Sequence, residues 1–263
     1  MCDFFKVSRS GYYVFLKRER SPKRDVALAT MIRQCQEKTR FTYGYRRVGL
    51  WLARQGVFVN HKAVLRIMNQ YGLSAQIRRC RKHRQMGCQL YKYANLLNRD
   101  FSAAGINQKW VIDISYIKTA QGTLYLSVII DLFDRSVVAY NMETNHSSKL
   151  VHDTVKKAIA KETVTAELQL HSDQGFQYTA PAYATLMKRY GITPSMSRRA
   201  NCYDNAVVES FFGTLKSECL NRQPVQSIEE ARFLIDLYMK FYNGERLQLK
   251  TKLTPLEKRR QFR

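Results

Sequence analysis

The feature that most restricts the fold of this chain is a change of hydrophobic period near Trp110. Three segments with the apolar pattern of β-strands follow, at 109–117, 123–132 and 135–143. A turn signal at Gln121-Gly122 and a weaker one at Asp134-Arg135 separate them. The pattern then predicts helix 147–161, strand 167–172, helix 180–190 and strand 192–196, and later helices 204–220 and 228–242. Three meandering strands followed by alternating helices and strands predict an α/β fold, with a mixed five-stranded sheet flanked by helices.

The first hundred residues have a different character. They carry 22 Lys/Arg against 5 Asp/Glu, whereas residues 101–263 carry 22 against 16. This asymmetry favours a polyanionic partner for the N-terminal part, and nucleic acid is the first candidate. An anionic membrane surface is disfavoured, because the basic segments lack a strongly apolar opposite face.

Three helices are predicted in this basic part, at 22–39, 45–55 and 61–71. Ser21 is expected to cap the first and Asn60 the third, which Gly72 ends. The apolar positions expected to point inward are Val26, Ala29, Ile32, Cys35, Val48, Leu52, Val64, Leu65 and Met68. The last two helices resemble a helix-turn-helix, with a plain helical hairpin as the alternative.

The charge run Arg78–Arg84 is too basic to pack and indicates a solvated linker or a phosphate-contacting arm. We expect a basic helical DNA-binding region at 1–76, a basic linker at 77–100 and a catalytic core with C-terminal helices at 101–263. The basic residues expected to contact DNA are Arg46, Arg47, Arg78, Arg79, Arg81, Lys82, Arg198, Arg199 and Lys216.

Cysteine and histidine spacing disfavours a structural zinc site, because the sequence contains no CxxC and no HxxxH. The Cys80/His83/Cys88 group is better interpreted as reduced thiols and a histidine in a basic loop. Scattered cysteines and the lack of a signal-peptide pattern favour a reducing cytoplasm. The longest apolar run, 124–132, is too short to span a bilayer, so no membrane partner is expected.

Three carboxylates occupy positions where a charge is costly or exposed. Asp113 interrupts the strand 109–117 on the face that carries Ser115, and Asp173 follows the strand 167–172 just before a Gln-Gly turn. Glu209 lies on the helix 204–220, at the edge of an apolar stripe that should face the sheet. Carboxylate oxygens suit Mg²⁺, and two such ions can drive displacement at a phosphodiester.

Each acid also has a simpler interpretation. Asp173 could be a turn residue and Glu209 a surface acid, and we interpret Asp131 and Asp134 as turn or capping residues. Lys216 lies two helical turns after Glu209 and points the same way, so it could hold a phosphate or be an ordinary surface lysine.

Several motifs in the expected order resemble one family. They are Ser8–Tyr13, Tyr43–Val48, Asn95–Phe101, Trp110–Ile117, His171–Tyr178, Asp204–Phe212, Leu215-Lys216, Tyr242–Arg246 and Leu253–Pro255. Together they are similar to bacterial insertion-sequence transposases of the D,D,E class, whose catalytic half resembles retroviral integrase. Between Asp173 and Glu209 lie 35 residues, the separation typical of that superfamily. Ser115 stands where a threonine is common, and Gln248 where the family usually has a histidine.

The resemblance implies a ribonuclease-H-like core and a metal-dependent polynucleotidyl transferase or endonuclease. Asp113, Asp173 and Glu209 would be catalytic and would bind two Mg²⁺ or Mn²⁺ ions. The implied DNA partner is double-stranded, both as the terminal inverted repeats of the element and as the target. The implied protein partners are further copies of the chain in a homo-oligomer and a fused or associated upstream-frame protein. The implied location is the bacterial cytoplasm, beside the nucleoid. The alternatives are a non-catalytic DNA-binding regulator and a nuclease of the same fold.

Overall fold

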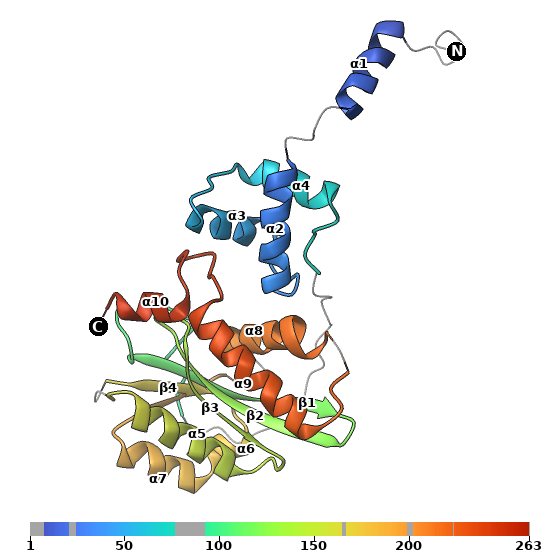
Figure 1. The fold of residues 1–263 in the computed structure, drawn as a ribbon. Helices are drawn as coiled ribbons and strands as arrows, with labels where there is room; N and C mark the ends of the chain where they lie inside the picture. Colours follow the sequence, from blue (N-terminus) through green and yellow to red (C-terminus); the bar gives the residue numbers. More distant parts are fainter. Residues whose placement is uncertain are drawn as a thin grey trace. The chain divides into compact units, whose positions relative to one another are not determined.

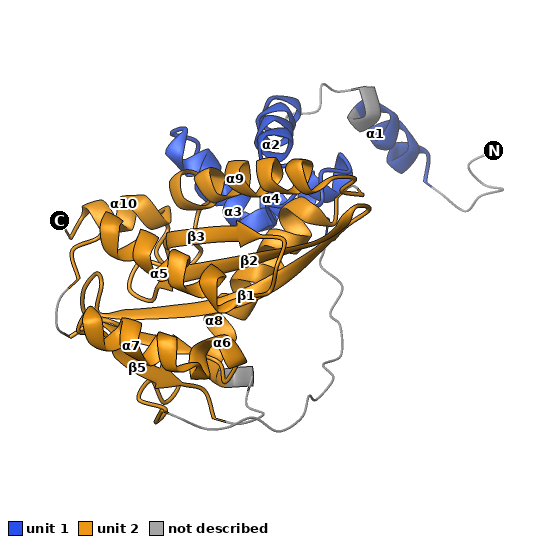
Figure 2. Cartoon of the chain, turned by 90° about the horizontal axis from the view of Figure 1, so that it is seen from below, with its two compact units in different colours: residues 1–77 blue, residues 78–263 orange. Residues whose placement is uncertain are grey.

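The computed structural model describes residues 8–20, 25–76, 93–164, 167–198, 202–222 and 224–262. The chain divides into two compact units, residues 1–77 and residues 78–263 (Figure 2). In the described part of the chain, no helix has both the length and the apolar character needed to cross a membrane.

The first unit is helical. Its helices are α1 (Arg9–Arg20), α2 (Val26–Lys38), α3 (Tyr45–Arg54) and α4 (His61–Gln70) (Figure 1). Helices α2, α3 and α4 contact one another around buried apolar side chains, among them Ile32, Cys35, Val48, Leu52, Val64, Ile67 and Met68. The buried Gln36 amide ties this core together, because its Nε2 donates to the carbonyls of Tyr43 (2.9 Å) and Leu73 (2.7 Å).

Three details of this unit differ from the sequence prediction. Helix α1 was not predicted at all. Leu65, expected inward, is 40% exposed, and Ile67 is buried instead, because the stripe that continues from Val64 at helical spacing passes through 67 and 68. Val26 is also exposed, since it lies in the first turn of α2.

The Asn60 cap is confirmed by its hydrogen bond from the Lys62 amide, whereas Ser21 lies outside the described residues.

The second unit contains a five-stranded sheet. Its strands are β1 (Lys109–Thr119), β2 (Gly122–Asp131), β3 (Val137–Glu143), β4 (Gln169–Ser172) and β5 (Thr193–Met196). The spatial order is β3-β2-β1-β4-β5. The first three strands are antiparallel neighbours, and β4 pairs in parallel with both β1 and β5. This is the mixed sheet that the order of elements predicted.

Helices cover both faces of this sheet (Figure 1). One face packs against α8 (Ala206–Leu215) and α9 (Ile228–Gly244), and the other against α5 (Ser148–Lys161) and α7 (Pro181–Arg189). Along β1, Val111 and Ile117 join the first core and Trp110 and Ile112 the second. The predicted alternation is therefore confirmed, and it assigns Asp113 to the α8/α9 face.

The segment that enters the second unit packs against the sheet. Leu97 is buried, and the amides of Leu96 and Leu97 donate to the hydroxyl of Ser195 on β5 at 3.0 and 3.3 Å. Residues 93–100, expected to end the linker, are thus held by the core. The remainder of the expected linker, 77–92, lies outside the described residues.

The C-terminal helix α10 (Pro255–Arg260), which was not predicted, closes the end of strand β2. Buried Arg259 donates to Asp131 (3.2 Å) and Asp134 (2.7 Å), and it pairs with Glu162 at 2.8 Å. The expected turn roles of the two aspartates are confirmed, because each also accepts from a backbone amide two residues ahead. Gln248 donates to the carbonyl of Asp134 at 3.0 Å.

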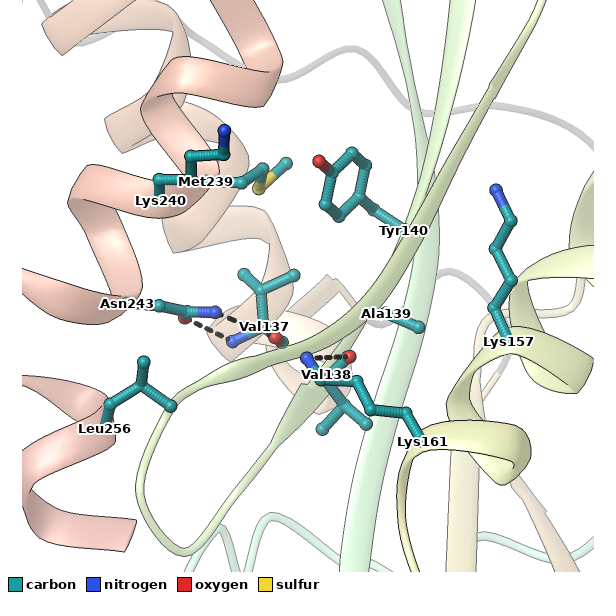
Figure 3. Close-up of a pocket in the computed structure, with 10 residues that line it drawn as sticks. All are labelled: Val137, Val138, Ala139, Tyr140, Lys157, Lys161, Met239, Lys240, Asn243 and Leu256. Carbon is teal, nitrogen blue, oxygen red and sulfur yellow. Dashed lines mark hydrogen bonds between the residues drawn. The ribbon is translucent and has the colours of Figure 1, made fainter. Parts of the chain in front are cut away.

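Strand β3 lies at one edge of the sheet, and side chains occupy its outward backbone groups (Figure 3). The amide of Asn243 in α9 accepts from the N–H of Val137 (2.8 Å) and donates to its carbonyl (2.9 Å). Lys161 donates to the carbonyl of Val138 at 3.0 Å. An edge strand treated in this way offers few free groups to another strand.

Candidate active site

Asp113 lies near the middle of β1, and its Oδ1 accepts a hydrogen bond from the amide of Ile114 at 2.7 Å. Burial raises the pKa of Asp113 well above its ordinary value, and the negative charges of Asp173 and Glu209 raise it further. The positive charge of Lys216 acts in the opposite direction. Four residues that are distant in sequence therefore share one electrostatic neighbourhood.

The parallel pairing of β1 with β4 explains how Asp173 reaches Asp113. Val111 is aligned with His171, so continuing both strands by two residues brings the two aspartates level. Asp173 Oδ1 accepts from the amide of Gly175 at 2.8 Å, and burial raises the pKa of Asp173. A Cβ atom at Gly175 would lie 2.9 Å from that oxygen, so a larger residue there would displace the Asp173 carboxylate.

Glu209 lies in the first turn of α8, and Lys216 follows at the end of the same helix. There the backbone changes to a π-helical turn, η2 (Lys216–Leu220), a feature often found at functional sites. Glu218 in this turn is held by the buried Arg246 at 2.7 and 2.8 Å and by the hydroxyl of Tyr238 at 2.9 Å. Arg246 thus fixes the turn that carries Lys216, a role that the sequence did not reveal.

The opposite end of α8 is held by Asp204, in the short 3-10 helix η1 (Cys202–Asn205). Its buried carboxylate accepts from Asn95 (2.8 Å), Arg99 (3.1 Å) and the amide of Arg198 (3.0 Å). Burial alone would raise the pKa of Asp204, but the hydrogen bonds from Arg198 and Arg99 lower it overall. Asp204 therefore connects the entry segment to the helix that bears Glu209.

His171 is buried beneath the site and is neutral. Its Nδ1 lies 2.8 Å from Ser195 Oγ, and its Nε2 lies 3.1 Å from Ser197 Oγ. Because Ser195 Oγ already accepts two amide N–H groups, its proton goes to Nδ1 and the ring donates from Nε2. Burial lowers the pKa of His171 to about 4, which agrees with a neutral ring.

The hydroxyl of Tyr178 is buried close to the two aspartates. Burial raises the pKa of Tyr178 well above its ordinary value, and the charges of Asp113 and Asp173 add to the effect. This hydroxyl has no hydrogen-bond partner within the described residues. Within the same part of the chain, no three His, Cys, Asp or Glu side chains are close enough to hold a metal ion as they stand.

The residues expected to bind DNA are distributed over both units. In the first unit Arg46 is exposed, with its guanidinium 5.6 Å from the ring centre of Tyr45, and Arg47 lies 5.7 Å from that of Tyr43. In the second, the half-exposed side chain of Arg198 also pairs with Asp204. Five residues lie outside the described part of the chain: Arg78, Arg79, Arg81, Lys82 and Arg199.

One polar surface of the first unit was missed. A shallow concavity lies along the outer side of α4, with Tyr45 of α3 at its border. It is lined by Tyr45, His61, Lys62, Leu65, Arg66 and Asn69. Arg66 is oriented there by Asp25 at 2.8 Å. Leu65, which is 40% exposed, lies on this side of α4, so this side of the helix faces solvent and not the core.

Known families match both units. The HTH-like domain family matches residues 23–81, and the integrase core domain family matches residues 103–202 and 190–248. A protein assigned as the transposase InsK of insertion sequence element IS150, from Escherichia coli K12, is 40% identical over 97% of this chain and 91% of its own length. The chain belongs to the insertion-sequence transposase family.

Other relatives agree with this assignment. The transposase InsF of insertion sequence IS3A, also from E. coli K12, is 35% identical over 91% of this chain and 85% of its own length. The transposase of element IS904 from Lactococcus lactis is 39% identical over 78% of this chain and 82% of its own.

A solved structure is similar in fold. A chain of the simian T-cell lymphotropic virus intasome, in complex with PP2A regulatory subunit B56 gamma, aligns with a TM-score of 0.53 at 16% identity. The alignment covers 86% of this chain and 73% of that one. The transposase is thus a polynucleotidyl transferase of DNA transposition, with an HTH-like helical unit and an integrase-type core.

Proposed function

We propose that this transposase cuts DNA at the ends of its element and transfers the freed ends to a new site, using Asp113, Asp173 and Glu209 to hold two divalent cations. The observation that carries the proposal is the shared neighbourhood of the three acids. Burial and the charges of Asp173 and Glu209 both disfavour ionised Asp113. A site that gathers half-buried negative charge in this way is suited to a bound cation.

The residues present fit hydrated Mg²⁺ or Mn²⁺. Carboxylate oxygens are the ligands that these hard cations prefer, and Mg²⁺ usually keeps several of its waters. The buried hydroxyl of Tyr178, with no partner in the described chain, would be available as a polar group to a water of such an ion. When bound, two ions activate the attacking oxygen and stabilise the leaving oxygen of an in-line displacement.

The protein's own residues then position the DNA. In the first step, water attacks phosphorus at an element end, the P–O3′ bond breaks, and a 3′-OH is released. In the second, that 3′-OH attacks a phosphodiester of another strand, and one P–O bond replaces another. Lys216, anchored through the turn that Arg246 holds, supplies a positive charge to a phosphate next to the acids.

Conservative substitutions of the acids test this assignment. Asp113→Asn, Asp173→Asn and Glu209→Gln are each expected to reduce Mg²⁺-dependent strand cleavage on the order of 10³-fold or more. Binding of the same DNA should change little, because phosphate contacts come from Lys and Arg. Asp153→Asn, on the surface of α5, is the matched control. Near-normal cleavage by one of the acid variants would remove that residue from the site.

We further propose that the first unit carries most of the duplex binding, through the outer side of α4. In the full chain, Lys62→Ala should weaken binding and reduce the slope of log affinity against log salt by about 1. Lys149→Ala on α5 carries the same charge change outside this unit and should leave the slope unchanged. Equal slopes for the two variants would contradict the role of α4.

The proposal includes oligomerisation on DNA. A complex of the protein with two element-end duplexes is expected to contain more than one copy of the chain, which mass photometry can count. A saturated complex that contains a single copy of the chain would contradict it. An upstream-frame partner remains a prediction, and an overlapping reading frame beside the gene would support it.

A further inference from the structure

Four aromatic side chains form an exposed group beside the acids. This aromatic cluster consists of Tyr116 on β1, Tyr125 on β2, His146 just before α5, and Phe176 on the short helix α6 (Phe176–Thr179). The rings of Tyr125 and His146 are stacked, with centroids 4.9 Å apart and planes 8° from parallel. Tyr116 meets both rings edge-on, at 6.0 and 6.2 Å. Phe176 meets His146 edge-on at 5.3 Å.

The aromatic cluster adjoins the proposed catalytic acids. Phe176 follows Asp173 by three residues, and the charge of His146 lowers the pKa of Asp173, against the larger effect of burial. Tyr116 follows Asp113 by three residues, so its side chain leaves β1 on the opposite face of the sheet, and the aromatic cluster adjoins the acids on the side of Asp173. The amide of Gln177, also on α6, is hydrogen-bonded to the ring of His146 and holds its orientation.

The cluster is open to solvent and does not belong to either core. Tyr116 and Phe176 are each 55% exposed, and neither joins a buried apolar cluster. Four rings from four separate segments therefore form an aromatic surface that does not contribute to the buried core. Stacking on aromatic side chains is the general way in which proteins hold unpaired bases of a nucleic-acid strand.

We infer that the aromatic cluster is a binding site for one unpaired nucleobase, next to the phosphodiester that the acids engage. The inference rests on the proposed function for the position of that phosphodiester. The next group along a DNA strand after such a phosphate is a sugar with its base, so a base is the ligand at hand. Stacking is worth about 1–3 kcal/mol per base, and it offsets the cost of unpairing a terminal base.

A fluorescence experiment with 2-aminopurine tests the inference. The full chain is mixed separately with three DNA probes, without divalent cation. In the first, one 2-aminopurine lies in an unpaired 5′ tail; in the second, it lies in the single strand opposite an internal gap; in the third, it lies in a fully paired duplex. Quenching in the tail assigns the base to an element-end strand, and quenching in the gap assigns it to a target strand. Wild-type protein should quench one of these two probes and leave the paired probe nearly unchanged.

Variants connect the signal to the cluster. Phe176→Ala and His146→Ala should lose most of the quenching and bind the quenched probe about tenfold more weakly. Phe176→Trp should keep the quenching. Phe233→Ala removes a 63% exposed ring on α9 and is the matched control. All variants should melt close to wild type, because the substituted rings lie at the surface.

Three results would overturn the inference. The first is equal quenching by Phe176→Ala and wild type. The second is that Phe176→Ala loses as much affinity for the paired duplex as for the probe with the unpaired base. The third is that Phe176→Ala forms a smaller oligomer than wild type without DNA, which would assign the cluster to contact with a second copy. The test is independent of cleavage. Normal cleavage by Asp113→Asn with normal quenching would remove the proposed triad alone, whereas absent quenching with triad-dependent cleavage would remove the nucleobase site alone.

Discussion

The second unit contains two groups of three acids, and they are built differently. Asp131, Asp134 and Glu162 surround the buried guanidinium of Arg259, which makes an ion pair with each of them. Asp113 and Asp173 accept backbone amides, and neither makes an ion pair within the described residues. The first group is compensated by Arg259, whereas in the second the positive charge of Lys216 only partly opposes the burial that raises the pKa of Asp113.

The effect of the first group of acids is visible in the pKa of Arg259. Burial alone would lower the pKa of Arg259, but the hydrogen bond to Glu162 and the charge of Asp134 raise it overall. The guanidinium therefore stays charged and neutralises part of the cluster. A carboxylate cluster built around a buried guanidinium is a structural element, whereas aspartates held by backbone amides, like Asp113 and Asp173, suit the proposed role of binding a cation from solution.

The largest effect is expected from removing the internal cation. Arg259→Ala leaves three buried carboxylates uncompensated and should lower the free energy of unfolding by about 3–5 kcal/mol. Arg260→Ala, an exposed neighbour on the same helix, is the control and should change it by less than about 0.5 kcal/mol. Urea denaturation of the three proteins measures the effect. A loss below about 1 kcal/mol for Arg259→Ala would show that α10 is dispensable.

The second prediction supplies the missing cation from solution. Mn²⁺ should stabilise wild type by about 2.7 kcal/mol at a concentration one hundred times its dissociation constant, because it binds the folded site. Asp113→Asn should lose most of this gain, and Asp131→Asn, if folded, should keep it. A thermal melt with and without Mn²⁺ gives the readout. Equal gains for wild type and Asp113→Asn would place the ion elsewhere.

The third prediction concerns the metal-free protein. Because the pKa of Asp113 is raised in the folded state, the folded protein holds this proton more tightly than the unfolded chain does. Its stability contribution is therefore present at low pH and is lost as pH rises through the folded pKa. Asp113→Asn should stabilise the metal-free protein by about 0.5–2 kcal/mol at pH 7 and by little near pH 4. Denaturation at both pH values checks the sign, and destabilisation at pH 7 would contradict it.

The smallest effect is expected for the positive charge of the acid site. Lys216→Ala should slow strand transfer about tenfold through lost phosphate positioning, yet change stability far less than Arg259→Ala does. Lys216→Arg should retain part of the rate. A strand-transfer assay and a melt of both variants separate the two effects. A wild-type rate in Lys216→Ala would return this residue to the surface-lysine interpretation.

Periodicity was sufficient for most of the fold. The alternation along 109–117 assigned Asp113 to one face of the sheet. The predicted apolar stripe along α8 and η2 is buried as expected, and it consists of Val208, Phe211, Leu215 and Cys219. Each pattern lies within a single strand or helix, so it can be recognised without knowing which other elements pack against it. The exposure of Leu65 shows the limit of this reasoning, because adjacent apolar residues on a short helix leave the inward side ambiguous.

Contacts that are distant in sequence could not be predicted. Arg259 meets Asp131 across 128 residues, and Arg246, in the segment after α9, meets Glu218 across 28 residues. Nothing in the local pattern around Arg259 distinguishes it from the exposed Arg260. The aromatic cluster was missed for the same reason, since its members belong to four segments. The acids Asp113, Asp173 and Glu209 were found because their motifs resemble a family, and their catalytic role remains a prediction.

The covering of strand β3 has a consequence for synthesis of the chain. Val137 receives its cover from Asn243, which lies 106 residues later, and Met142 receives a hydrogen bond from Arg232 after 90 residues. At translation rates of about 5–20 residues per second, Val137 waits roughly 5–20 s before Asn243 has been made. During that interval the nascent edge is open to strands of neighbouring chains on the same messenger. The speed of translation between β3 and α9 therefore sets how long each new copy is exposed to mispairing.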